Sequence, residues 1–363
     1  MSAPTQQDLS LNDVMPSTND ESSLEPSSTK TPKRSVKLVI KICKFLILVL
    51  VVLWLGWQLQ KNWREIQTYH WNPRFHWLVA SGLFYLTAYL ASAIFWSLTL
   101  RWLGQKTSFY EGVKAFYYSQ LGKYIPGKAM VVVIRTGIVS DKGARASVAV
   151  ACVFYETLMM VGTGAFLAGI LTFFYFHAQH VWALLALGVA LCSLVPLYPP
   201  VFTRLLRILR VNANDPTFQD QLKALNCKSF LLGVALMSIL WLFMGLSLWA
   251  TLWGVGITPT PLNLTTIVRL VVTTALATTL GFAIPIAPGG LGIREAVLST
   301  LLTTYLAMLL AMPANSDMAL APEALATIVS LCQRITQILS EIVCALSFFG
   351  VDQLRRLSRL DRA

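Results

Sequence analysis

Two short strings in the sequence combine residue types that bind anions. Each string holds a Pro-Gly pair, at 126–127 in the first and 288–289 in the second, with cationic side chains close by. A helix that starts after Pro-Gly presents free backbone N–H groups and the positive end of its dipole, which together attract phosphate. The sequence therefore predicts two anion-binding elements. Their candidate residues are Lys123, Pro126, Gly127, Lys128 and Arg135 in the first and Pro288, Gly289, Gly290, Gly292 and Arg294 in the second.

Residues 122–129 also come close to the GxxxxGK[ST] phosphate loop of nucleotide hydrolases. Ala129 stands where that loop has the Ser or Thr that holds magnesium, and no β-strand is credible before it. No soluble stretch is long enough to form a nucleotide-binding domain. We therefore expect no bound nucleotide, and no other pattern in the sequence implies a cofactor or a metal site.

Four ionisable residues fall inside long apolar runs: Glu156, Arg269, Arg334 and Glu341. Each would cost about 2.5–3.5 kcal/mol at the centre of a bilayer, so these groups must pair, face water or lie near an interface. Arg334, Gln337 and Glu341 are spaced at i, i+3 and i+7 and share one helix face, which we expect to point into a helix bundle. Two interpretations stay open: with Glu156 this face lines a polar pathway, or its charges only hold helices together.

The composition indicates the elements that carry these residues. The chain has 363 residues, of which 55% are hydrophobic and only 13% are charged, against about 25% charged in an ordinary soluble domain. Several apolar runs reach the length that spans a bilayer. The net charge of +12 comes from basic residues that flank these runs, which is typical of the positive-inside rule and not of a nucleic-acid surface. The sequence predicts an all-α polytopic membrane protein that contacts phospholipid and no nucleic acid.

The hydropathy pattern predicts about eight membrane segments. The apolar runs lie at 45–59, 75–100, 148–171, 181–199, 229–254, 264–284, 291–311 and 324–349. Residues 1–29 are predicted to be a disordered tail, 30–44 a basic juxtamembrane segment, 45–350 the membrane domain and 351–363 a basic tail. The basic residues at both ends place both termini in the cytoplasm and the protein in the inner membrane.

The charges of the loops predict two interrupted elements that enter from opposite faces. The stretch 113–134 is broken by Gly and Pro and must leave and return on the cytoplasmic side. The stretch 264–311 must start and end outside, either as two full spans or as a re-entrant hairpin. Matching Pro/Gly interruptions in two halves are typical of inverted-repeat transporters, whose substrate sites lie at such breaks. The alternative to a repeat is that Gly and Pro are simply common in membrane helices. The alternative to anion binding is that the charges near the breaks only anchor the tips of the elements at headgroup level.

The motifs together resemble the lysylphosphatidylglycerol synthase transmembrane family, the flippase-like domain also found at the N-terminus of the multiple peptide resistance factor. The residues that carry the resemblance are the string LGKYIPGK with Arg135, Glu156 in a following span, the string PIAPGGLGIREA, and Arg334 in the last span. The resemblance covers about residues 40–350. It assigns Glu295 to the second motif and Glu156 to the acid that follows the first.

The chain departs from the family pattern at two places in its first half, in the first motif and directly after Glu156. Ala129 and Met130 stand where a Gly is common, and Thr157 stands where an Arg often follows the acid. The resemblance implies a membrane domain that moves or handles anionic phospholipids. It does not imply lysyl transfer, because the longest internal hydrophilic stretch, 200–228, is far too short for a soluble transferase domain.

Three functions are compatible with these residues. The first is a protein that binds and flips an anionic or modified phospholipid or a lipid-linked substrate, with the phosphate between the two Pro-Gly motifs and with Glu156, Glu295 and Glu341 balancing charge or carrying protons. The second is the membrane subunit of a lipid-modifying transferase, which would need a cytosolic partner because the chain has no catalytic constellation of its own. The third is an assembly factor that uses the N-terminal tail as a contact.

Overall fold

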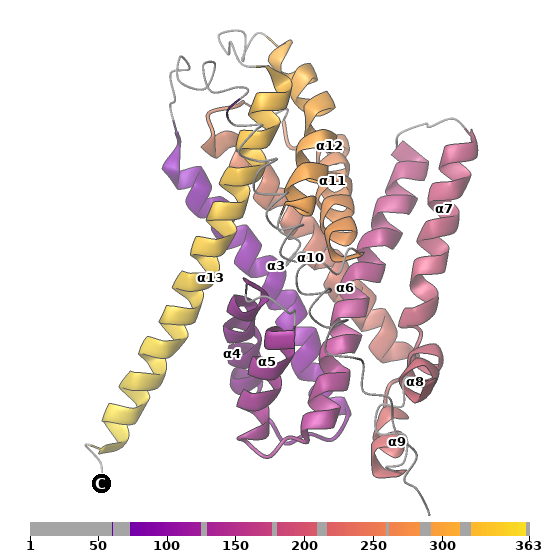
Figure 1. Cartoon of the computed structure of the whole chain (residues 1–363), viewed down its shortest axis with the longest axis vertical. Coiled ribbons are helices and arrows are strands. Elements are labelled where there is room, and N and C mark those ends of the chain that lie inside the picture. The colour runs from indigo at the N-terminus through magenta and orange to yellow at the C-terminus, as the bar shows by residue number, and fades with distance from the viewer. Residues whose placement is uncertain are drawn as a thin grey trace, which may run out of the picture. The chain divides into compact units, whose positions relative to one another are not determined.

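The computed structural model describes residues 60, 73–124, 129–175, 180–208, 216–258, 261–283, 292–312 and 321–360. Across these residues the protein is all-α (Figure 1). The predicted span at 45–59, both N-terminal segments and the residues Pro126, Gly127, Lys128, Pro288, Gly289 and Gly290 lie outside the described residues.

Six described helices are long and apolar enough to cross a membrane. They are α3 (Phe75–Trp102), α6 (Ala146–Tyr175), α10 (Cys227–Gly254), α11 (Leu264–Ala283), α12 (Ile293–Leu310) and α13 (Pro322–Leu360). A seventh candidate is a bent pair, α7 (His180–Leu194) with α8 (Pro199–Ile208), which turns by 68° after the short η2 (Val195–Leu197). Every predicted run after 45–59 therefore coincides with one of these elements, which confirms an all-α polytopic membrane protein.

The less apolar stretch, predicted to be broken, forms two short helices in place of one span. These are α4 (Phe109–Gln120) and α5 (Ala129–Ser140), with the 3₁₀ turn η1 (Leu121–Tyr124) after α4. Ser108 caps α4 by accepting a hydrogen bond from the backbone N–H of Glu111 at 3.2 Å. The helices α4 and α5 pack against each other beside α3 (Figure 1), so the interruption brings two helix ends together.

Small residues allow the long helices to approach closely. The hydroxyl of Ser81 on α3 donates to the carbonyl oxygen of Ser247 on α10 at 2.8 Å and lies 2.9 Å from the hydroxyl of Thr251. A Cβ atom on Gly169 of α6 would lie 2.4 Å from the carbonyl oxygen of Ala186 on α7. Small and hydroxyl side chains of this kind hold helices together in lipid, where apolar burial alone provides little attraction between helices.

The packed side chains form two apolar clusters. One gathers residues of α3, α4, α6 and α10, with the amphipathic α8 and the short α9 (Pro216–Leu222) covering part of it through Phe202 and Phe218. The other joins the C-terminal half of α10 to α11, α12 and the first turns of α13. The buried ionic groups belong to helices of both clusters, and α13 contacts α3, α4, α10 and α12. The helix α13 therefore lies against α4, which leads into the first predicted motif, and against α12, which begins with the second.

Candidate functional site

The described part of the first motif is a turn packed tightly against the start of α5. A Cβ atom on Gly122 would lie 2.9 Å from the backbone nitrogen of Val131 and 3.0 Å from the carbonyl carbon of Met130. Backbone atoms cannot move aside as a flexible side chain can, so this position requires glycine. The turn thereby fixes the place of the two residues that follow, Lys123 and Tyr124.

The ammonium group of Lys123 forms an ion pair with the buried carboxylate of Glu341 on α13. The hydroxyl of Tyr85 on α3 also donates to this carboxylate, and the hydroxyl of Tyr124 donates to it at 2.9 Å. Three tyrosine rings surround the ammonium, with its nitrogen 5.8 Å from the ring centre of Tyr85, 5.4 Å from that of Tyr89 and 5.2 Å from that of Tyr124. Cations within about 6 Å of aromatic ring centres are attracted to them, so we call Tyr85, Tyr89, Tyr124 and Glu341 the tyrosine cage.

The second cation of the first motif, Arg135 on α5, pairs with Glu156 on α6. One guanidinium nitrogen donates to the carboxylate at 2.9 Å, and the Nε group donates to the hydroxyl of Ser119 at 2.9 Å. The hydroxyl of Ser92 donates to the other carboxylate oxygen, and the guanidinium lies 4.2 Å from the ring centre of Phe116. Both charged side chains are almost completely buried. The pair is electrically neutral and well supplied with hydrogen bonds, as a stabilising buried pair must be.

The described part of the second motif is the start of α12. Gly292 has a φ of +83°, a conformation that side-chain-bearing residues rarely adopt. Its backbone N–H donates to the carboxylate of Glu295 and begins the helix. A Cβ atom on Gly281 of α11 would lie 3.1 Å from the Cβ atom of Arg294. Glycines therefore allow the Arg294 backbone to sit against α11 at the break between the two helices.

The polar face of α13 contacts both motifs. Arg334 lies 3.5 Å from the carboxylate of Glu295 in the second motif, and its guanidinium lies 5.3 Å from the ring centre of Tyr124 in the first. Arg294 donates a hydrogen bond of 2.8 Å to the side-chain oxygen of Gln337. The buried positions of Arg334, Gln337 and Glu341 confirm that this face points into the bundle. The structure thus joins Lys123, Arg294, Glu295 and the three α13 residues into one buried network.

This network carries an excess of positive charge. Three cations, Lys123, Arg294 and Arg334, face two carboxylates, Glu295 and Glu341, which leaves one positive charge uncompensated among the described residues. Arg294 is the cation whose hydrogen-bond partner is neutral. An isolated buried charge is costly unless an opposite charge compensates for it, so the network favours an anion near Arg294.

Two buried amides on α13 add hydrogen-bonding capacity. The side-chain nitrogen of Gln337, and both polar side-chain atoms of Gln333 one turn away, have no hydrogen-bond partner among the described residues. Both side chains are at most 1% exposed. Buried amides in native structures nearly always have partners. These groups are therefore available to bind a ligand inside the bundle.

Sequence reasoning found the charged residues of the network and Gln337, but it missed the three tyrosines of the cage and the two serines beside the Arg135–Glu156 pair. Tyr85, Tyr89 and Tyr124 complete the tyrosine cage, and Ser92 and Ser119 complete the Arg135–Glu156 pair. The i, i+4 spacing of Tyr85 and Tyr89 within a span could have predicted a polar site on that face of α3. Two tyrosines on one helix face inside a bilayer need partners for their hydroxyls.

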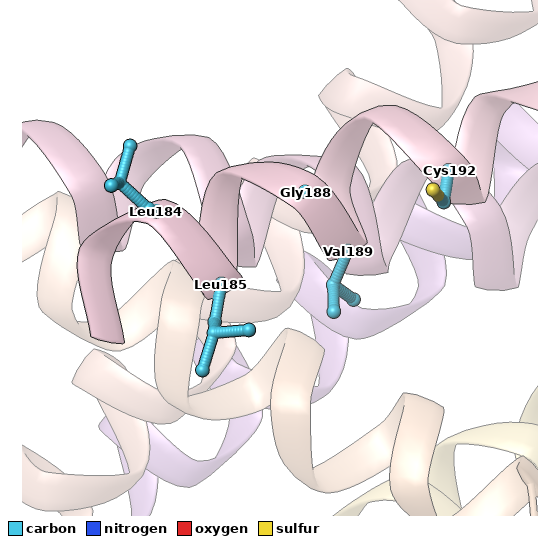
Figure 2. Close-up of a pocket in the computed structure, with 5 residues that line it drawn as sticks. All are labelled: Leu184, Leu185, Gly188, Val189 and Cys192. Carbon is cyan, nitrogen blue, oxygen red and sulfur yellow. The ribbon is translucent and has the colours of Figure 1, made fainter. Parts of the chain in front are cut away.

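A separate hollow on α7 has an apolar lining, in contrast to the charged network on α13. It is a shallow, open hollow of about 500 Å³ lined by Leu184, Leu185, Gly188, Val189 and Cys192, all on one helix (Figure 2). It contains no ionisable carboxylate or cation and none of the predicted site residues. Such a surface suits lipid acyl chains but provides no group that recognises a phosphate.

Comparison with known proteins identifies one family. The family described as Lysylphosphatidylglycerol synthase TM region matches residues 41–314. No curated protein and no solved structure matches the chain. The matched range contains both motifs and ends before α13, which supplies the partners of Lys123 and Arg294.

Proposed function

The chain belongs to this family, and on that premise we propose that it binds and translocates an anionic or modified phospholipid, with the lipid phosphate held at Arg294. The observation that carries the proposal is the excess positive charge where the described residues of the two motifs meet on α13. Arg294 has a neutral hydrogen-bond partner in Gln337, so a phosphate at Arg294 would compensate the charge of the whole network.

The remaining motif residues take supporting positions in this proposal. The backbone N–H groups after Pro126-Gly127 and Pro288-Gly289 would add donors to the phosphate, with Lys128 adding charge. Arg135 and Glu156 neutralise each other and so act as a structural pair near the site. The opposed, interrupted elements would form the two halves of an inverted repeat around the lipid headgroup, as in transporters with broken helices.

The test measures movement of headgroup-labelled lipids across proteoliposomes that contain the full chain. The lipids are phosphatidylglycerol, its lysyl derivative and phosphatidylcholine. We expect movement of an anionic or aminoacylated lipid, and a loss of at least about tenfold in Arg294→Gln, because a charge-assisted hydrogen bond contributes about 1.5–3 kcal/mol. Arg269→Gln is the matched control, since Arg269 is an intramembrane arginine that lies over Tyr305, outside the network.

Two results would overturn the proposal. Undiminished lipid movement in a well-folded Arg294→Gln variant would remove the phosphate from Arg294. No movement of any lipid by the wild-type protein would favour the alternative, a membrane subunit that serves a lipid-modifying transferase. Copurification of a cytosolic enzyme with the full chain would then be the next measurement.

A further inference from the structure

The tyrosine cage has the composition of a binding site for an organic ammonium ion. Three aromatic rings face one cation, and a buried carboxylate neutralises it. Proteins recognise ammonium ligands with this combination of rings and negative charge. Here the ammonium inside the cage belongs to the chain itself, because Lys123 fills it.

Lys123 is suited to be a displaceable occupant. Its charge sits at the end of a flexible four-carbon stem, so the ammonium can leave the cage without any change in the backbone. Glu341 retains hydrogen bonds from Tyr85 and Tyr124 when Lys123 is absent. The cage therefore remains assembled and negatively charged for another cation.

The cage lies beside the proposed phosphate position. Glu341 follows Gln337, the partner of Arg294, by four residues on α13, which places the two side chains about 6 Å apart along the helix axis. A headgroup in which a short linker joins an ammonium to a phosphate has its two charges in a matching arrangement. The cage attracts the positive end and Arg294 attracts the negative end.

We infer that the tyrosine cage binds the primary ammonium of a zwitterionic phospholipid headgroup, and that Lys123 occupies the cage as a tethered competitor until that headgroup displaces it. The inference rests on the proposed function only for the placement of the phosphate at Arg294, and it differs from that proposal in the net charge of the lipid. Because the bound ammonium replaces that of Lys123 beside Glu341, the phosphate still compensates the excess positive charge of the network. The cage adds a determinant of specificity that the anion site alone does not supply, because phosphate recognition cannot distinguish headgroups by their amine.

The test compares binding of two lipids that differ only in the ammonium. Purified full-length protein in nanodiscs is titrated with acyl-labelled phosphatidylethanolamine and with its N-acetyl derivative, and the ratio of the two dissociation constants is measured. In Lys123→Met the competitor is gone, so we expect the preference for phosphatidylethanolamine to rise roughly tenfold over wild type. The double variant Lys123→Met/Glu341→Gln keeps an uncharged cage and should lose that gain.

Lys114→Met is the matched control. Lys114 also lies over a tyrosine ring, 5.7 Å from the ring centre of Tyr110, and pairs with a carboxylate, that of Asp352 at 3.0 Å. This second lysine is outside the cage, so its replacement should leave the lipid preference unchanged.

If Lys123→Met fails to fold, a second variant tests the inference. Lys123→Arg retains the charge and pairs more firmly with Glu341 through the planar guanidinium of the arginine. We then expect a severalfold weaker preference for phosphatidylethanolamine than in wild type.

The outcomes separate this inference from the proposed function. An unchanged preference in folded Lys123→Met, or equal weakening of both lipids, overturns the inference even if the protein still moves lipids. A preference that rises in Lys123→Met and is lost in the double variant supports the cage even if translocation is never observed. An unchanged preference in Lys123→Arg, where that variant is needed, also overturns it.

Discussion

The buried pair between Arg135 and Glu156 permits a quantitative prediction. Their side chains are 2% and 5% exposed, and the two charged groups are 2.9 Å apart. At an effective dielectric constant of about 20 their Coulomb attraction is about 6 kcal/mol. Removing one partner leaves a buried charge alone, which costs about 3–5 kcal/mol. We therefore expect Glu156→Gln to lower the free energy of unfolding by about 3–5 kcal/mol, and Arg135→Met by a similar amount.

The double variant makes this prediction specific. Arg135→Met/Glu156→Leu removes both charges and replaces them with apolar groups, which is often nearly neutral for stability. We expect it to be close to wild type, with a coupling energy of at least about 3 kcal/mol between the two sites. The pair Lys142–Glu111 is the matched control, because its side chains are 52% and 20% exposed at a similar distance of 3.1 Å. Single substitutions there should cost no more than about 1 kcal/mol.

Reversible unfolding of the purified protein in mixed micelles, followed by loss of helical circular dichroism, measures these free energies. A cost below about 1 kcal/mol for Glu156→Gln would contradict the reasoning, as would a double variant that loses the sum of both single costs. Lipid movement in the double variant addresses the role of Arg135. Movement retained at the wild-type rate would place Arg135 outside the lipid contacts. We expect this result because Glu156 already neutralises the charge of Arg135.

Three further predictions follow from backbone positions and from the charge pattern. Gly122→Ala should destabilise the protein by about 1–3 kcal/mol, because the added Cβ atom would meet the backbone of Val131. Gly137→Ala in α5 should stabilise it by about 0.5–1 kcal/mol, because a Cβ atom there has open space. Thermal unfolding of the two variants measures this difference. Gly292→Ala should cost about 1–3 kcal/mol because of its positive φ, and a wild-type melting temperature would refute this. A tag within residues 351–363 should be cleaved by protease added to inside-out vesicles but protected in intact cells, if the C-terminus is cytoplasmic.

The sequence was most informative about features that repeat along a single segment. Apolar length predicted α3, α6, α10, α11, α12 and α13 because the bilayer sets the length of a span. The i, i+3 and i+7 spacing of Arg334, Gln337 and Glu341 predicted one buried face, which the structure confirms. The interruption of the stretch 113–134 was also predicted, since Gly and Pro disrupt a helix and are visible in the sequence, and α4 ends within that stretch at Gln120.

The sequence could not assign partners across the bundle. Lys123 pairs with Glu341, 218 positions later, and Arg135 pairs with Glu156, although hydropathy and charge gave no reason to prefer these combinations over others. Periodicity fixes which residues share a face, but the neighbour of that face depends on how helices pack, and packing depends on small residues such as Gly82 and Gly245. For the same reason, the sequence alone assigned Lys123 and Arg135 to anion binding, whereas the structure shows each paired with a carboxylate.

The position of α13 has a consequence for where the folding unit ends. The range that matches the family stops at residue 314, before α13 begins at Pro322. A chain cut at that point would retain both motifs yet leave Lys123 without Glu341 and Arg294 without Gln337. The smallest autonomous piece of this protein therefore has to reach through Glu341, and expression trials that take the matched range as a domain boundary should yield insoluble or rapidly degraded product.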